Sequence, residues 1–340
     1  MSMIASITLD ELLARFNLDP APFRQVVSRY PCRLTPYYAG LIQGPGDPIW
    51  RQCVPNPLEL ADDGQQPDPL DEERLSPVPG LIHRYPDRAV LVVSNRCAVY
   101  CRFCMRKRQV GCGAPGFDLE RAIEYLAATP QIRDVVLSGG DPLLLPLDQL
   151  HTMLSRLRAI PHLEIVRIGS RVPVTAPELI TPQLCRMLAE HHPLYLNTHF
   201  NHPRELTREA AQACSLLADV GIPLGNQTVL LQGINDSALV LGQLFSGLLR
   251  LRVRPYYLHQ MDLVRGTAHF RTPLERGMEL VAALRGKVSG LAIPHFVVDL
   301  PGGQGKVPLL AQTVQPGDDG WAIRNLAGRW VTYHDPGGVS

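Results

Sequence analysis

From about residue 88 onward, short apolar, β-branched segments alternate with segments whose apolar residues recur at helical spacing. Repeated strand–helix units form a parallel sheet with the crossover helices outside it. The sequence contains six such units, two fewer than a complete eightfold barrel, so it predicts an α/β fold with a partial, laterally open (β/α)6 barrel. The strand-like segments are RAVLVVS, DVVLSGG, LEIVRIGS, LYLNTHF, IPLGNQTVLL and VRPYYLHQM.

The barrel is predicted to occupy residues 81–300, between two smaller regions. Residues 1–80 are expected to form helices and loops, with a threonine in TLDELLARF as a helix cap. Within them, the Pro- and Asp-rich residues 54–79 show no clear period and predict an ordered connection at best. A last strand candidate, AIPHFVVDL, precedes residues 301–340, which are expected to form a glycine-rich turn and a short C-terminal extension.

The composition is typical of a globular chain and argues against several functional classes. The chain is 45% hydrophobic and 19% charged, which indicates a sizeable core. Its net charge of +1 predicts no broad basic surface for nucleic acid. No apolar run reaches the ~18 residues of a membrane span, and the N-terminus lacks the regions of a signal peptide. We therefore expect a cytoplasmic protein.

The strongest chemical motif is CAVYCRFC, which places Cys97, Cys101 and Cys104 on one loop after the first barrel strand. A tight cysteine cluster in a cytosolic chain more often binds metal or performs chemistry than forms disulfides. Three thiolates can ligate three irons of a [4Fe-4S] cluster and leave the fourth iron open. Structural zinc, which uses four closed ligands and would need Cys112, and ordinary buried thiols are the alternatives.

Other polar residues collect where the predicted strands end. In parallel barrels the site lies at the carboxyl ends of the strands, so these residues predict a site at that edge. They are GGDP after the second strand, Arg171 after the third, Asn201 and His202 after the fourth, Asn226 and Gln227 within the fifth, and Asp262 after the sixth.

The cysteine spacing, with Phe103 before the last cysteine, resembles the signature of the radical S-adenosylmethionine (SAM) enzymes. The resemblance implies that the open iron binds SAM and that reductive cleavage yields a 5'-deoxyadenosyl radical. It also implies an electron donor of the flavodoxin or ferredoxin type. Cys112 has no counterpart in the signature and is interpreted as incidental. A plain turn is the ordinary reading of SGGDP, but the resemblance assigns contacts with the methionyl part of SAM to Ser138, Gly139, Gly140 and Asp141.

Residues from about 80 to 312 also resemble the lysine 2,3-aminomutase family, in seven blocks that occur in the same order. This resemblance implies a second cofactor, pyridoxal 5'-phosphate (PLP), and conversion of L-lysine to β-lysine by radical-driven imine migration. The same chemistry on arginine, ornithine or glutamate, or on lysine for modification of elongation factor P, is the alternative. The blocks are HRYPDRAVL, YCRFCMRKR, RIGSRVPV, LNTHFNHPRELT, PLGNQTVLLQGIND, RPYYLHQMDLVRGTAHFRTP and FVVDLPGGQGKVPL.

Four residues are candidates for holding PLP. A lysine in a glycine-rich turn is ordinarily a surface residue, but Lys306 matches the PLP-lysine position of the family and could form an imine if its amine is desolvated. Arg84 and Arg88 in HRYPDR match positions that bind the PLP phosphate, which a guanidinium pair can clamp, with surface ion pairing as the alternative. Gln227 falls on a position that contacts PLP.

Three residues are candidates for binding the substrate. The resemblance assigns the α-carboxylate to Arg106. Asp262 and Asp299 each follow a strand at the same end of the barrel, and two carboxylates suit the ε-ammonium of lysine, although solvated loop aspartates are the alternative. Beside Arg106, Lys107 and Arg108 are predicted to be outward-facing, solvated charges.

The chain also departs from the family. Well-studied members carry C-terminal cysteines that bind zinc between subunits, whereas this chain has no cysteine after Cys214. We therefore expect no such zinc. The oligomeric state is left open, and a homo-oligomer that lacks this zinc is one possibility. A radical SAM enzyme without PLP would give no role to Lys306, Arg84 and Arg88. A zinc-binding interaction protein would need a fourth ligand at regular spacing.

Overall fold

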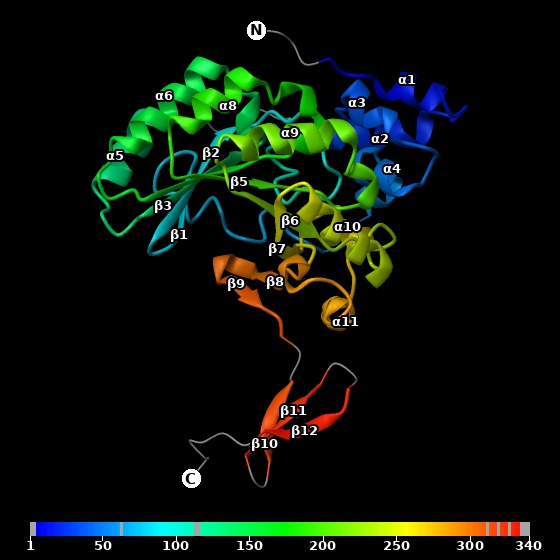
Figure 1. The fold of residues 1–340 in the computed structure, drawn as a ribbon. Helices are drawn as coiled ribbons and strands as arrows, with labels where there is room; N and C mark the ends of the chain where they lie inside the picture. The colour runs from blue at the N-terminus through cyan, green and yellow to red at the C-terminus, as the bar shows by residue number, and fades with distance from the viewer. Residues whose placement is uncertain are drawn as a thin grey trace.

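The structure is a computed structural model that describes residues 5–61, 64–111, 116–310, 313–317, 320–325 and 328–333. Its main element is a nine-stranded sheet whose strand order follows the sequence (Figure 1). Strands β2 to β8 run parallel, and β1 and β9 pair antiparallel with the two ends of this set. The strands are β1 (Leu81–Tyr85), β2 (Arg88–Ser94), β3 (Asp134–Gly139), β4 (Ile165–Gly169), β5 (Leu194–Thr198), β6 (Leu224–Val229), β7 (Val253–His259), β8 (His295–Leu300) and β9 (Gly305–Pro308).

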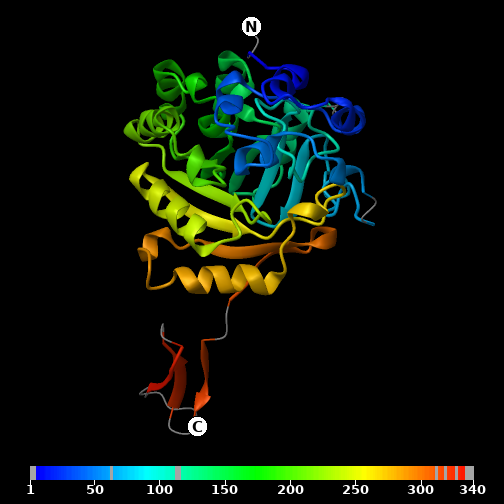
Figure 2. The same cartoon turned by 90° about the vertical axis from the view of Figure 1, so that its right-hand side faces the viewer.

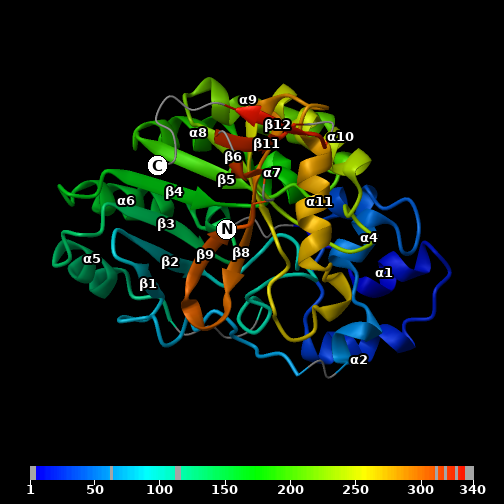
Figure 3. The same ribbon diagram turned by 90° about the horizontal axis from the view of Figure 1, so that it is seen from below.

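Within the described residues, the two edge strands β1 and β9 do not pair with each other. The sheet is therefore a partial, laterally open barrel of the kind that the strand pattern predicts. Figure 3, seen from below, shows β1 and β9 as separate edges. The six predicted strands are β2 to β7, and the last strand candidate forms β8, a seventh parallel strand.

Crossover helices cover the outer face of the sheet (Figures 1 and 2). A further helix, α11 (Leu274–Leu284), lies between β7 and β8. Figure 2 shows α11 alongside the last part of the sheet. The segments with helical spacing between the strands form α5 (Leu119–Ala127), α6 (Leu147–Arg158), α8 (Pro182–Ala189), α9 (Arg208–Asp219) and α10 (Ala238–Arg250), and the short α7 (Val172–Thr175) follows β4.

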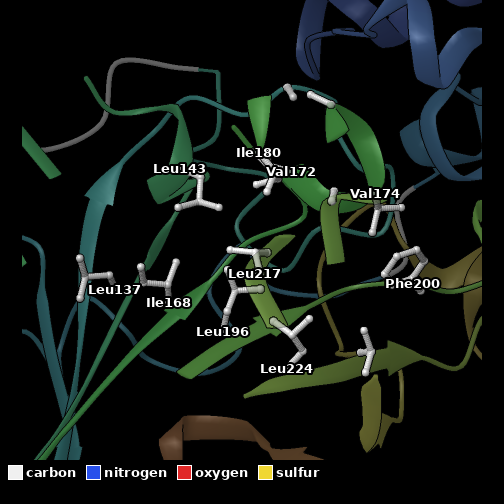
Figure 4. Close-up of a cluster of buried hydrophobic side chains, with 14 of the residues drawn as sticks. Leu137, Leu143, Ile168, Val172, Val174, Ile180, Leu196, Phe200, Leu217 and Leu224 are labelled. Atoms are coloured by element: carbon white, nitrogen blue, oxygen red, sulfur yellow. The ribbon is translucent and has the colours of Figure 1, made fainter. Parts of the chain in front are cut away.

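The core lies between the sheet and these helices. Leu137, Ile168, Leu196 and Leu224 occupy registered positions on four successive strands and are all buried. Figure 4 shows this row beside Leu217 of α9. Because side chains alternate along a strand, burying this row fixes the register and turns the intervening residues towards the inside of the barrel.

Residues before the barrel form the short helices α1 (Leu9–Ala14), α2 (Ala21–Arg29), α3 (Pro36–Gly40) and α4 (Pro48–Cys53), and the 3-10 helix η1 (Pro57–Leu60). The predicted threonine cap of the first helix is confirmed. The amide of Glu11 donates to Thr8 Oγ1 at 3.2 Å, and the amide of Thr8 donates to Glu11 Oε2 at 2.7 Å. This reciprocal pair is a capping box, which satisfies two amides at the helix start.

After β8 the chain turns back, and β9 pairs with it so that Asp299 lies opposite Lys306. The predicted PLP-lysine turn is therefore part of the barrel sheet. Strands β10 (Val314–Gly317), β11 (Gly320–Arg324) and β12 (Trp330–Tyr333) form a second, antiparallel sheet, which Figure 1 shows apart from the barrel. Among the described residues, no helix has both the length and the apolar character needed to cross a bilayer.

Candidate active site

The three clustered cysteines lie on the loop that follows β2, and all are partly buried. The amide of Cys104 donates to the carbonyl of Cys101 at 3.1 Å in a tight turn. Burial, followed by the proximity of Cys101, raises the pKa of Cys104 to about 11. Burial, Asp141 and the other two thiols likewise raise the pKa of Cys97. Such thiols become thiolates when a cation binds them, so this loop fits an iron–sulfur cluster. Cys112 lies outside the described residues.

One of the cysteines has a fixed cationic partner. Arg171 follows β4 and donates from Nη1 to the sulfur of Cys101 at 2.8 Å. Its Nη2 donates to Glu205 Oε1 at 2.8 Å and to Gln52 Oε1 at 2.7 Å, so the guanidinium is held in place. Hydrogen bonds to cluster sulfurs tune the reduction potential of a cluster. The strand-end pattern located Arg171, and the structure places it against the cysteine loop.

The glycines of SGGDP allow two loops to meet. A Cβ added to Gly139 would lie 2.4 Å from the carbonyl oxygen of Ser94, and one added to Gly140 would lie 2.4 Å from that of Arg96. Gly139 also has φ +119°, which side chains disfavour. The glycines therefore let the end of β3 pack directly against the segment that leads into Cys97.

Asp141 completes this junction. Its carboxylate accepts hydrogen bonds from Ser170 Oγ at 2.7 Å, from the amide of Arg171 at 2.7 Å and from the amide of Leu143 at 3.1 Å. Burial raises its pKa to about 6 against these hydrogen bonds. The predicted SAM motif thus joins the ends of β3 and β4 beside the cysteine loop.

Lys306 lies in an enclosed polar cluster, in contrast to the surface position that is ordinary for a turn lysine. Its Nζ hydrogen-bonds to Asp299 Oδ2, lies 3.2 Å from His259 Nδ1 and stands 5.3 Å from the centre of the Tyr257 ring. Burial raises the pKa of Asp299, but the hydrogen bond from His259 and the charge of Lys306 outweigh it and hold the pKa below its usual range. The side chain of Lys306 is 22% exposed.

Arg84 extends the same cluster from β1. Its Nη1 lies 3.5 Å from Asp299 Oδ1, and its Nη2 donates to the carbonyl of Leu70 at 3.2 Å. Its buried Nε has no hydrogen-bond partner in the described part of the chain. A buried, unpaired N–H on a guanidinium near Lys306 fits an anionic group such as the PLP phosphate.

Arg88 and Gln227 reach Lys306 through aromatic neighbours. The guanidinium of Arg88 stacks 4.1 Å from the centre of the Tyr85 ring, and the hydroxyl of Tyr85 accepts from the amide of Lys306 at 2.8 Å. Gln227 pairs in register with Tyr257, whose ring lies under the lysine amine. Arg88 and Gln227 are thus linked to Lys306 only through Tyr85 and Tyr257, and the Arg88 side chain is 41% exposed and also pairs with Asp87 at 3.4 Å.

The two predicted substrate aspartates also converge. Asp262 lies three residues beyond the end of β7, and Asp299 is the penultimate residue of β8, which pairs in parallel with β7 so that His259 stands opposite Val297. Burial, and then the negative charge of Asp299, raises the pKa of Asp262 to about 7. An ammonium group bound beside Asp262 would lower this pKa again, because an opposite charge favours the ionised carboxylate.

Arg106 is paired on the cysteine side of this region. Its Nε and Nη2 donate to the two carboxylate oxygens of Glu72 at 3.0 and 2.7 Å, and its Nη1 donates to Ser138 Oγ at 3.1 Å. The predicted substrate-carboxylate residue and the first residue of the predicted SAM motif are therefore in direct contact.

The prediction that Lys107 and Arg108 are solvated is wrong. Lys107 is 2% exposed, and its Nζ donates to Glu59 Oε2 at 2.6 Å, an acid that is also bound by the buried Arg102. The side chain of Arg108 is 13% exposed and lies 3.0 Å from Asp68. The reason is that the residues before β1 fold over the cysteine loop and bring acidic partners to its basic residues.

Replacing Lys107 with alanine should reduce the free energy of unfolding by about 3 kcal/mol, because Glu59 stays buried with only part of its counter-charge. Urea denaturation measures the change. Arg74→Ala is the matched control, since the Arg74–Asp71 pair is 66% and 42% exposed and should contribute less than about 1 kcal/mol. Equal losses in the two variants would contradict the account in which buried Glu59 needs both Arg102 and Lys107 as counter-charges.

Sequence reasoning missed several contributors to this region. His259 could have been found, because it ends a strand at the same edge as the other polar residues. Tyr85 and Glu72 had weaker indications. Tyr85 lies in HRYPDR between two candidate arginines, and Glu72 lies in residues 54–79, which show no period.

Comparison with protein-family models agrees with this layout. Residues 91–240 match the Radical SAM superfamily, and residues 281–339 match a model described as Lysine-2,3-aminomutase. The first match contains the cysteine loop and the SGGDP motif. The second contains Asp299 and Lys306.

Full-length relatives extend the match. The L-lysine 2,3-aminomutase of Fusobacterium nucleatum is 51% identical over 89% of this chain and 73% of its own length. That of Acetoanaerobium sticklandii is 51% identical over 97% of this chain and 82% of its own. The glutamate 2,3-aminomutase of Clostridioides difficile is 41% identical over 96% and 79%. This chain therefore belongs to the lysine 2,3-aminomutase family of radical SAM isomerases, whose cofactors are a [4Fe-4S] cluster, SAM and PLP.

Proposed function

We propose that this protein moves the α-amino group of L-lysine to the β-carbon and so forms β-lysine. The observation that carries the proposal is that Asp262 and Asp299 lie at the same end of the paired strands β7 and β8, where Asp299 hydrogen-bonds to Lys306. Two carboxylates fit the ε-ammonium of lysine and would repel the side-chain carboxylate of glutamate. The similarity to L-lysine 2,3-aminomutases supports the same substrate.

Three groups of residues would hold the three cofactors. Cys97, Cys101 and Cys104 would hold the cluster, and Ser138, Gly139, Gly140 and Asp141 would line the SAM site. Lys306, Arg84, Arg88 and Gln227 would hold PLP. The cluster and SAM, reduced by a flavodoxin- or ferredoxin-type donor, supply a 5'-deoxyadenosyl radical, and PLP carries the migrating nitrogen.

The protein's own groups then position the substrate. Arg106 binds the α-carboxylate, and Asp262 and Asp299 bind the ε-ammonium. Holding both ends of lysine fixes its β-carbon, and such orientation supplies a large part of a rate enhancement. Asp299 pairs with the amine of Lys306, and His259 Nδ1 lies 3.2 Å from Nζ, so both side chains orient the lysine.

Replacing Asp299 with asparagine should mainly raise the KM for lysine, by about tenfold or more, because a charge-assisted hydrogen bond to the ε-ammonium is lost. Asp262→Asn tests the other half of the pair without removing the Lys306 partner. Asp219→Asn, whose side chain is 63% exposed and pairs with Arg252, is the control. Unchanged lysine KM values in both site variants would remove the pair from the substrate site.

The alternative is the same chemistry on glutamate, arginine or ornithine, or on lysine for modification of elongation factor P. The similarity to a glutamate 2,3-aminomutase supports glutamate as an alternative substrate.

The reaction class is tested by omitting one component at a time from an anaerobic assay with L-lysine. β-Lysine should form only when PLP, SAM and a reductant are all present. Formation of β-lysine without PLP would contradict the proposed role of Lys306.

A further inference from the structure

Glu72 binds Arg106 along one edge of the guanidinium group. A guanidinium has five N–H groups. The Nε–H and one N–H of Nη2 point to the two oxygens of Glu72, and one N–H of Nη1 points to Ser138 Oγ. One N–H on each of Nη1 and Nη2 therefore remains for another acceptor.

Glu72 is buried, and its backbone is fixed by hydrogen bonds. Glu72 is 5% exposed, and its backbone carbonyl accepts from Ser76 Oγ at 2.7 Å. Arg108 lies 3.7 Å from the same carboxylate. Three residues further on, the carbonyl of Leu75 accepts from the amide of His83 in β1 at 2.9 Å, which ties the segment to the sheet. Glu72 is thus a fixed part of the site.

We propose that Glu72 is a positioning residue that holds Arg106 by its Nε–Nη2 edge and directs the remaining N–H groups of Nη1 and Nη2 to the substrate carboxylate. This inference rests on the proposed function, in which Arg106 binds that carboxylate. Arginine forms two bonds with a carboxylate only when its plane has the correct orientation. Without Glu72, the guanidinium would keep its charge but lose that orientation.

The competing interpretation is that Glu72 occupies the place of the substrate carboxylate and must leave before lysine binds. The contacts favour the positioning role, because Glu72 uses the side edge of the guanidinium and leaves N–H groups on both terminal nitrogens. The two interpretations predict opposite effects of removing the charge. Positioning predicts weaker lysine binding, and competition predicts tighter binding.

The test compares Glu72→Gln with Glu73→Gln in the enzyme loaded with cluster and PLP. Glu73 is adjacent, but its side chain is 71% exposed and pairs with Arg108, so its variant controls for the loss of one charge. We expect Glu72→Gln to raise the lysine KM about tenfold with a smaller effect on kcat, at unchanged iron and PLP content. Glu72→Asp, which keeps the charge, should recover part of the loss.

A second ligand distinguishes positioning from general damage to the fold. The diamine 1,5-diaminopentane carries two amines but no carboxylate, so its inhibition constant should be the same in wild type and Glu72→Gln. If the diamine also binds about tenfold more weakly, or if Glu72→Gln binds lysine as well as or better than wild type, the proposal is overturned.

Arg106→Gln separates this inference from the proposed function. If this variant binds lysine as well as wild type does, the assignment of the carboxylate to Arg106 fails, and the inference fails with it. If Arg106→Gln weakens lysine binding but Glu72→Gln does not, only the positioning role of Glu72 is wrong.

Discussion

Replacing Lys306 with alanine should abolish turnover while leaving the iron content unchanged. The amine of Lys306 is the candidate anchor for PLP, and it lies far in sequence from the cysteine loop. The chain has only two other lysines. Lys107 is buried against Glu59, and Lys287 is exposed after α11. Neither lies in the polar cluster of Asp299 and His259, so neither can replace Lys306.

The measurement combines borohydride reduction with an assay. Wild type and the control Lys287→Ala should each retain covalently bound PLP after reduction, whereas Lys306→Ala should retain none. Turnover of Lys306→Ala should fall by about 10³-fold or more, because covalent catalysis is lost. A Lys306→Ala variant whose turnover is close to that of the wild type, or one that still becomes covalently labelled by PLP, would refute this assignment.

Replacing Cys101 with alanine should remove the cluster and leave the PLP site intact. Cys101 is the thiol that accepts from Arg171, and three cysteine ligands are needed to leave one iron open. The variant should contain much less iron after reconstitution and should not cleave SAM. Its Lys306 should still become labelled by PLP under borohydride.

Cys112→Ala provides the control for the number of cluster ligands. The sequence interpretation leaves Cys112 out of the cluster, so this variant should keep its iron and its ability to cleave SAM. Loss of iron from Cys112→Ala equal to that from Cys101→Ala would indicate four protein ligands and contradict an open iron.

The barrel could be predicted because each strand shows its pattern of apolar and polar residues within a few consecutive positions. Rows such as Leu137, Ile168 and Leu196 face the helices, and the polar residues gather where the strands end. The parallel-sheet rule then places residues such as Asp262 and Asp299 at one edge although they are far apart in sequence. Lys306 lies opposite Asp299 because β9 turns back and pairs antiparallel with β8.

The environment of the cysteine loop could not be predicted in the same way. Glu59 and Glu72 lie in an aperiodic segment, and their partners Arg102, Lys107 and Arg106 are 34 to 48 residues further along the chain. Hydrophobic periodicity carries no information about ion pairs at that separation. The basic run around Lys107 therefore resembled a solvated surface, although the structure buries it.

The central claim is tested most directly by a substrate comparison. The reconstituted protein would be assayed anaerobically with iron, sulfide, PLP, SAM and dithionite, with L-lysine, L-glutamate, L-arginine and L-ornithine supplied separately, and the products separated by chromatography. The account predicts β-lysine from L-lysine and little product from the other three. A β-amino acid formed preferentially from L-glutamate would contradict the assignment of Asp262 and Asp299 to an ammonium group.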